Sequence, residues 1–137
     1  MDRLTIDSDV ERIEEARTWI AGEARAAGFG DDAVGELELA LTEAVANVIE
    51  HAYGDAPGEP IELWAECDGA TLRVRVRDWG RAPDPGSVHG RDLDDPGVGG
   101  YGVHLMDRLM DDVTREPQPE GGTLLTLIKT RKDVPHG

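Results

Sequence analysis

Apolar and polar positions alternate over some short stretches of the chain and recur every three to four residues in others. Strict alternation predicts a half-buried strand, and the wider spacing predicts an amphipathic helix. Near the start, Leu4 and Ile6 alternate with polar neighbours as in a short strand. The first helix is expected to follow a capping box, with Ser8 as N-cap and Glu11 at the third helical position, and to end at the glycines of 28–30.

A second amphipathic helix is predicted from Asp31 or Asp32, either of which can act as its N-cap, to about Ala52. With a step of about 100° per residue, its apolar side chains fall on one stripe that faces the core. Three polar side chains are then stacked one turn apart along the edge of this stripe: Glu43, Asn47 and His51. A solvated helix face with a satisfied histidine is the alternative explanation of the same pattern.

Further along the chain, alternation returns and predicts an antiparallel hairpin. Its strands are expected at 61–67 and 71–78, joined by a turn at Asp68-Gly69. Parity places Asp78 on the apolar side of the second strand. A carboxylate there is costly unless a hydrogen bond satisfies it, so Asp78 is a candidate functional residue.

The remaining elements are predicted as a helix at 103–110, strands at 113–116 and 123–130, and a frayed tail at 131–137. Residues 80–102 hold seven of the 17 glycines and three of the eight prolines, which predicts a long mobile loop of the lid type. Helices on one face of a mixed, mainly antiparallel sheet define an α+β fold, a two-layer α/β sandwich. We expect residues 1–137 to form a single domain.

Composition narrows the class of protein. The chain has 137 residues and a formal net charge of −15. This charge repels nucleic-acid phosphates and suits a basic protein partner, so an anionic ligand would need a cradle of backbone amides or a divalent cation. A single cysteine, Cys67, excludes an internal disulfide, and no apolar stretch is long enough to span a membrane. We therefore expect a cytoplasmic protein that binds neither nucleic acid nor membrane.

The polar residues described above fit the chemistry of a nucleotide. Asn47 can offer a neutral oxygen to Mg²⁺, and Glu43 one turn earlier can accept a proton from a hydroxyl. Asp78 can accept a hydrogen bond from an exocyclic amine, and Gly80 lets a flat base approach the backbone. The glycine-rich run at 97–102 leads into a helix, whose N-terminus and preceding amides can hold phosphate. A capped surface turn and a flexible linker are the alternative explanations of the last two motifs.

The motifs occur in a defined order along the chain. They are Glu-x3-Asn-x3-His-Ala on a helix, Asp-x-Gly at a strand end, Gly-x-Gly-Gly-x-Gly before a helix, and Gly-Thr opening the last strand. This order resembles the GHKL (Bergerat-fold) ATP-binding superfamily, and within it the small bacterial anti-sigma factors that are serine-protein kinases. The resemblance covers residues 31–129. It departs at Ala82-Pro83, where the common pattern has a second glycine two residues after Gly80.

The resemblance implies a role for each matching residue. Glu43 matches the proposed general base, Asn47 the ligand of Mg²⁺, and His51 the end of the same box. Asp78 matches the aspartate that binds the adenine amino group, with Gly80 beside the base. The remaining matches are the glycines of the ATP lid and a threonine near the adenine pocket: Gly97, Gly99, Gly100, Gly102 and Thr123.

The function implied by the resemblance is that of an ATP-dependent serine/threonine-protein kinase with ATP and Mg²⁺ as cofactors. Such a protein sequesters a sigma factor, phosphorylates an anti-sigma antagonist of the STAS type, and forms a homodimer. The alternatives are a non-catalytic module that binds nucleotide, a switch kinase with another target, and a metal-dependent hydrolase that uses Glu43 and His51. The intact Glu43 counts against the module, and the spacing of eight residues without paired histidines counts against the hydrolase.

Overall fold

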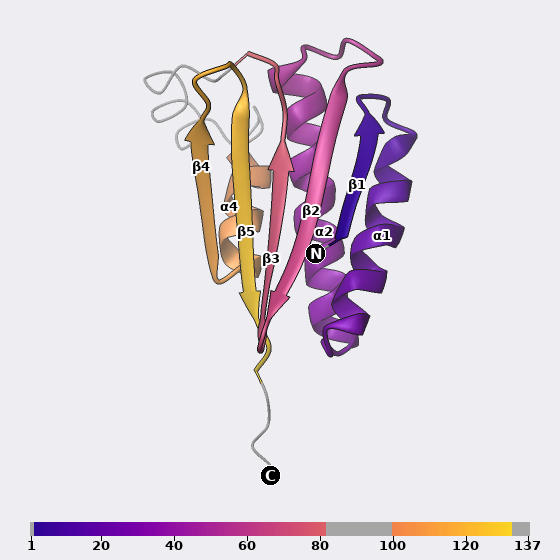
Figure 1. Cartoon of the computed structure of the whole chain (residues 1–137), viewed down its shortest axis with the longest axis vertical. Coiled ribbons are helices and arrows are strands. Elements are labelled where there is room, and N and C mark those ends of the chain that lie inside the picture. Colours follow the sequence, from indigo (N-terminus) through magenta and orange to yellow (C-terminus); the bar gives the residue numbers. More distant parts are fainter. Residues whose placement is uncertain (1, 82–99, 133–137) are drawn as a thin grey trace.

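The computed structural model describes residues 2–81 and 100–132 of the chain (Figure 1). In this part, one five-stranded sheet has the strand order β1-β2-β3-β5-β4. The strands are β1 (Asp2–Asp7), β2 (Pro60–Asp68), β3 (Thr71–Arg77), β4 (Asp112–Pro117) and β5 (Thr123–Thr130). Every neighbouring pair is antiparallel, so the predicted hairpin is confirmed and the described sheet is antiparallel throughout rather than mixed.

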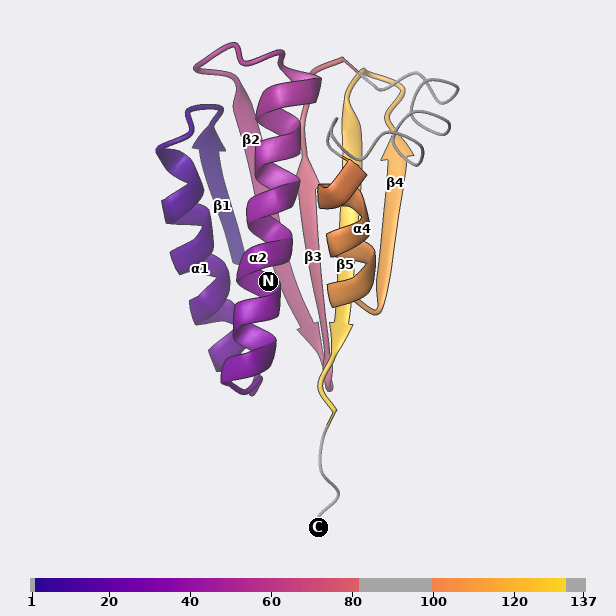
Figure 2. The same cartoon turned by 180° about the vertical axis from the view of Figure 1, so that it is seen from behind.

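All the described helices cover one face of the sheet. They are α1 (Arg12–Ala26), α2 (Asp31–Asn47), the π-helical turn η1 (Val48–Ala52) and α4 (Gly100–Leu109). Figure 2 shows α2 between α1 and α4, with the sheet behind all three, whereas the opposite face of the sheet is open in Figure 1. The predicted α+β class and two-layer sandwich are therefore confirmed. None of the helices within 2–81 and 100–132 is long and apolar enough to cross a membrane.

The core lies between the two layers. In the sheet, Leu63 of β2 pairs with Val76 of β3, and Val76 pairs with Leu125 of β5. These three paired side chains form an apolar row that crosses three neighbouring strands. Ile20 and Leu41, which have 0% and 1% of their surface exposed, pack on this face from the helices. Full burial of such a side chain stabilises the fold by roughly 1.5–3 kcal/mol, which anchors α2 against the strands.

The predicted capping box at the start of the first helix is wrong. The helix begins at Arg12, with Glu11 at the N-cap position and no side-chain cap. Ser8 is instead 2% exposed, and its hydroxyl donates to the Ala56 carbonyl at 2.6 Å and accepts from the Glu59 N–H at 2.9 Å. The hydroxyl is therefore used by a loop about 50 residues away in the chain, because burial favours a side chain that satisfies two backbone groups at once.

The second helix begins at Asp31, with Gly30 rather than an aspartate at the N-cap. Asp31 and Asp32 lie in its first turn, where their charges favour the positive end of the helix dipole without capping it. The predicted helical path to Ala52 is confirmed. Its last five residues form a π turn, closed by the Tyr53 N–H donating to the Val48 carbonyl at 3.0 Å.

The C-terminal elements occur where the sequence predicts them, with two differences. The helix α4 begins at Gly100, so it includes residues that were predicted as loop. The predicted fraying from residue 131 is wrong at its first position, because the Arg131 N–H donates to the Ala70 carbonyl at 2.7 Å and its guanidinium donates to the Ala27 carbonyl at 3.2 Å. Residues 133–137 lie outside the described part.

Candidate functional site

The first group of predicted site residues lies on α2 and η1. Glu43 and Asn47 are half-buried beside the fully buried Ala44 and Val45 of the same helix. Their side chains form no hydrogen bond or ion pair with any residue that the structure describes. The Glu43 carboxylate and the Asn47 amide are thus available at the edge of the core, which is where the helical pattern predicted these two residues.

His51 differs from the other two. It lies within the π turn, where the rotation per residue differs from that of an α-helix. The step of about 100° therefore does not predict on which side of the helix His51 lies. Its side chain is 52% exposed, and Nε2 lies 3.9 Å from the Glu50 carboxylate. The structure therefore places His51 near the end of the helix but on an exposed turn.

Asp78 follows the last residue of β3 and is 4% exposed, so the predicted inward orientation is confirmed. Its Oδ1 accepts a hydrogen bond from the Gly80 N–H at 3.0 Å, and its own N–H donates to the Thr123 carbonyl at 3.1 Å. Burial raises the pKa of the Asp78 carboxyl, while the amides of Gly80 and Thr123 and the charge of Arg77 oppose that shift. The site thus contains a buried acceptor held by backbone donors.

Gly80 connects this strand end to the end of η1. The Arg81 N–H donates to the Ala52 carbonyl at 2.8 Å, and a Cβ built on Gly80 would lie 2.3 Å from the same carbonyl oxygen. No side chain larger than hydrogen fits there. The sequence predicted a glycine for the approach of a base, and the structure adds a second requirement, which is the approach of the helix end.

Two residues that the sequence reasoning missed hold the strand end from opposite sides. The Tyr53 hydroxyl accepts from the Trp79 N–H at 2.8 Å. The Arg77 guanidinium, on the open face of the sheet, donates to the carbonyls of Asp78 and Gly121 and lies 3.3 Å from the Glu120 carboxylate. Arg77 also stacks over the Trp79 ring at 4.5 Å. Alternation placed Arg77 on the polar face correctly but could not show that the β4–β5 turn buries it.

The predicted phosphate-binding glycines are only partly described. Gly97 and Gly99 lie outside the described residues, as do Ala82 and Pro83. Gly100 and Gly102 form the first turn of α4, which packs against α2. The C-terminal end of the predicted lid, residues 100–102, is therefore a helix N-terminus on the same face of the sheet as α2 (Figure 2).

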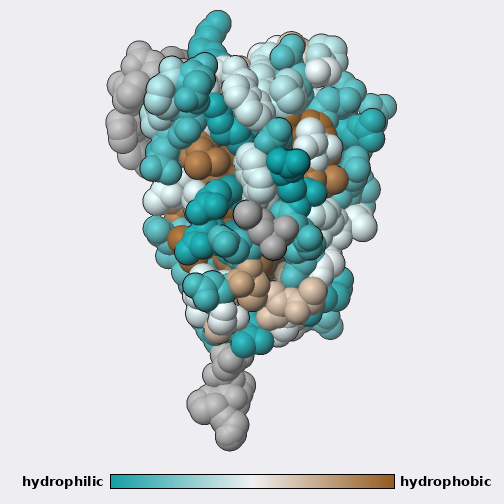
Figure 3. Space-filling view, in the orientation of Figure 1, coloured by the Kyte–Doolittle hydropathy of each residue, from teal (hydrophilic) through white to brown (hydrophobic). Residues whose placement is uncertain are grey.

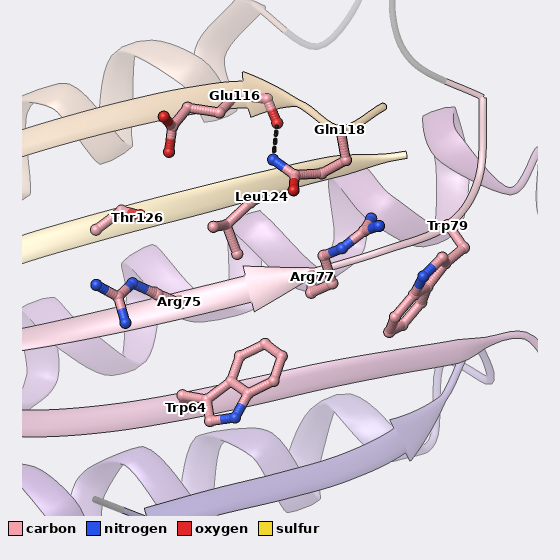
Figure 4. A pocket seen from close by; sticks show the side chains of 8 residues that line it. All are labelled: Trp64, Arg75, Arg77, Trp79, Glu116, Gln118, Leu124 and Thr126. Carbon is pink, nitrogen blue, oxygen red and sulfur yellow. Dashed lines mark hydrogen bonds between the residues drawn. The ribbon is translucent and has the colours of Figure 1, made fainter. Parts of the chain in front are cut away.

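A hollow of about 430 Å³ lies on the open face of the sheet, opposite the helices (Figure 4). It is lined by Trp64, Arg75, Arg77, Trp79, Glu116, Gln118, Leu124 and Thr126. Figure 3 shows this face as mainly hydrophilic with separate apolar patches. The hollow includes none of the predicted nucleotide-binding residues. Arg77 connects the hollow to these residues, because its guanidinium donates from this face to the Asp78 carbonyl.

The donor set fits a magnesium ion held mainly by a ligand rather than by the protein. Within 2–81 and 100–132, no group of three or more His, Cys, Asp or Glu side chains is placed to bind a metal. Asn47 supplies one neutral amide oxygen without a hydrogen-bond partner among the described residues. Mg²⁺ in nucleotide sites takes few protein ligands and completes its shell with phosphate oxygens and water.

The antiparallel sheet, the helices on one face and the buried aspartate at a strand end place the chain in the class of α+β ATPase domains. Residues 6–129 match the histidine kinase-like ATPase domain family, and the chain belongs to this family. The predicted resemblance is thereby confirmed at the level of the family.

Two similar curated proteins share the name serine-protein kinase RsbW. Serine-protein kinase RsbW of Listeria innocua serovar 6a is 33% identical over 124 residues, covering 82% of this chain and 78% of that protein. Serine-protein kinase RsbW of Bacillus velezensis is 26% identical over 142 residues, covering 98% and 89%. These relatives support the prediction of a protein serine/threonine kinase.

Solved structures agree on the fold. A crystal structure of the RsbU and RsbW domains of a Mycobacterium tuberculosis protein matches with a TM-score of 0.67 at 20% identity. The match covers 95% of this chain, which spans about a third of that longer chain. The histidine kinase domain of a blue-light activated kinase from Erythrobacter litoralis matches with a TM-score of 0.56 at 19% identity, over 88% of this chain and 63% of that one.

Proposed function

We propose that this chain is an ATP-dependent serine/threonine-protein kinase that acts as an anti-sigma factor in a partner-switching pathway. The observation that carries the proposal is the buried Asp78, whose carboxylate is held by the Gly80 N–H next to the end of the helix that bears Glu43 and Asn47. Membership of the histidine kinase-like ATPase family and the relatives named serine-protein kinase support the same chemistry.

In this proposal Asp78 binds the base. Its Oδ1 already accepts from Gly80, and a carboxylate has lone pairs left to accept from the amino group of adenine. Thr123 lies beside it, since its carbonyl accepts from the Asp78 N–H. Gly80 has no side chain to obstruct the base as it approaches the backbone. His51 is the last polar residue of the motif that begins with Glu43 and Asn47.

The reaction is assigned to Glu43, Asn47 and the lid. Bound Mg²⁺ would neutralise phosphate charge in the transition state. The amide oxygen of Asn47 would hold that ion, and Glu43 would accept the proton of the attacking Ser or Thr hydroxyl. The γ-phosphate would rest on backbone amides of the lid and of the α4 N-terminus: Gly97, Gly99, Gly100 and Gly102.

The proposed partners are a sigma factor and a STAS-domain antagonist, which compete for the same protein. Phosphorylation would add about −1.5 to −2 charges to the antagonist, and repulsion from a chain of net charge −15 would favour its release. A homodimer in the cytoplasm is part of the same proposal. The rival proposal is a non-catalytic module, in which nucleotide only orders a partner surface.

The test begins with calorimetric titration of ATP into the protein, with and without Mg²⁺. Wild type is expected to bind, Asp78→Asn to lose most of the affinity, and Asn47→Ala to lose the dependence on Mg²⁺. Transfer of radiolabel from γ-labelled ATP to a STAS protein then separates the two proposals, with Glu43→Gln as the inactive control. Binding without transfer favours the module, and no binding by wild type overturns the nucleotide site.

A further inference from the structure

The Tyr53 hydroxyl joins two segments that reach the site from different parts of the chain. It donates to the carbonyl of Pro60, the first residue of β2, at 2.6 Å and accepts from the Trp79 backbone N–H at 2.8 Å. The Tyr53 backbone N–H closes the π turn on Val48. The ring therefore begins at the end of the helix that carries Asn47 and ends at the segment that follows Asp78.

The Trp79 N–H belongs to the peptide group that follows Asp78. The carbonyl of this same peptide accepts from Arg77 on the other side of the sheet, so both its donor and its acceptor are held. A peptide fixed at both groups cannot rotate freely about its flanking bonds. This restrains the start of the segment that carries the Gly80 N–H, which donates to the Asp78 carboxylate at 3.0 Å.

Tyr53 is suited to donate and accept together. Burial raises the pKa of its phenol, and the charges of Asp78 and Glu59 act in the same direction, whereas the Trp79 amide and Arg77 oppose them. The phenol therefore stays protonated at neutral pH and keeps the proton that it donates to Pro60.

We propose that Tyr53 is a positioning residue for base recognition, acting through the Trp79 peptide to hold the Asp78 carboxylate where it accepts from adenine and opposes guanine. This rests on the proposed function. Adenine presents an amino group at the position where guanine presents a carbonyl, and a fixed carboxylate attracts the first and repels the second. If the Asp78–Gly80 segment is free to rotate, the carboxylate can turn away from guanine and the distinction weakens.

The test compares Tyr53→Phe with Ser8→Ala. The first variant removes the hydroxyl that holds Trp79 and Pro60, whereas the second loosens the same loop through Ala56 and Glu59 without touching Trp79. Of the two hydrogen bonds lost in Tyr53→Phe, the one from the Trp79 N–H restrains the Asp78 segment, and its loss should weaken ATP binding by about 3- to 10-fold. The affinity for GTP should change little, so the ratio of ATP to GTP affinity falls. Ser8→Ala should leave that ratio at the wild-type value.

A second readout needs no nucleotide. In Tyr53→Phe the amide hydrogen of Gly80 should exchange faster with solvent in NMR measurements than in wild type and in Ser8→Ala. Unchanged Gly80 exchange together with an unchanged ATP to GTP ratio overturns the proposal, as does an equal change in Ser8→Ala. If wild type binds neither nucleotide, the proposed function fails, and the Gly80 exchange alone decides whether Tyr53 positions this segment.

Discussion

The Gly80 N–H donates to the Asp78 carboxylate at 3.0 Å, so the residue predicted to bind the base is held by the glycine predicted to let the base approach. The two residues form one structural unit. Because Gly80 also lies against the Ala52 carbonyl, the geometry of the strand end depends on contact with the helix that carries Glu43 and Asn47. Both halves of the candidate site are therefore coupled through backbone contacts.

Replacement of Gly80 by alanine should damage both stability and nucleotide binding. The added Cβ would lie 2.3 Å from the Ala52 oxygen, and a backbone oxygen cannot move without shifting η1. We expect the free energy of unfolding in urea to fall by about 1–3 kcal/mol. Gly35→Ala is the matched control, because nothing lies within 4 Å of its Cβ position in α2, and a helical alanine should stabilise by about 0.5–1 kcal/mol. A Gly80→Ala protein as stable as wild type would contradict the close contact.

Loss of the Arg77 side chain should destabilise the protein far more than loss of its neighbour on the same face. Arg77 is 8% exposed and bonds to two carbonyls and to Glu120, so Arg77→Ala should cost about 2–3 kcal/mol in urea denaturation. Arg75 has no hydrogen bond or ion pair within the described residues, and Arg75→Ala should stay within about 0.5 kcal/mol of wild type. Equal losses in the two variants would show that the β4–β5 turn is not held by Arg77.

Most of the helices and strands that the sequence predicted correctly were predicted from the local periodicity of apolar residues. Alternation identified the hairpin and the inward direction of Asp78, because parity depends only on residues next to each other in the chain. Ser8 and Arg77 could not be assigned in this way, since their partners are about 50 and 43 residues away along the chain. Tyr53 gave only a weak signal, a phenol at the end of a helix that needs a partner when buried. The order of the motifs pointed to the family, but the contacts that hold the site depend on tertiary packing.

Two substitutions of Ser8 distinguish its observed role from that of a helix cap. An N-cap serine can be replaced by aspartate at little cost. The observed Ser8 is 2% exposed and donates to the Ala56 carbonyl, which an ionised aspartate cannot do. Ser8→Asp should therefore lower the free energy of unfolding by more than Ser8→Ala, whose loss should be about 1–2 kcal/mol. A Ser8→Asp variant with wild-type stability would instead support the capping box.

Glu23 on α1 should make the stability of the protein depend on pH near neutrality. Burial, a hydrogen bond with Asp2 and the charge of Asp2 raise the pKa of Glu23 from 4.5 to about 7. A folded pKa above the unfolded value means that the folded state keeps a proton that the unfolded state has lost. The resulting stabilisation is fully present below pH 4.5 and is lost as the pH rises through 7.

Glu23→Gln should remove this dependence. At pH 5 the variant should match wild type, and at pH 8 it should be more stable by up to about 1 kcal/mol, a small value because water and salt screen a pair that is not fully buried. Urea denaturation at several pH values measures the difference between the two proteins, which cancels the titration of other groups. Glu14→Gln on the same helix is the control, since Glu14 pairs with Arg17 at 3.2 Å instead of with a carboxylate. A difference between Glu23→Gln and wild type that is constant from pH 5 to 8 would show that Asp2 and Glu23 do not share a proton in the folded protein.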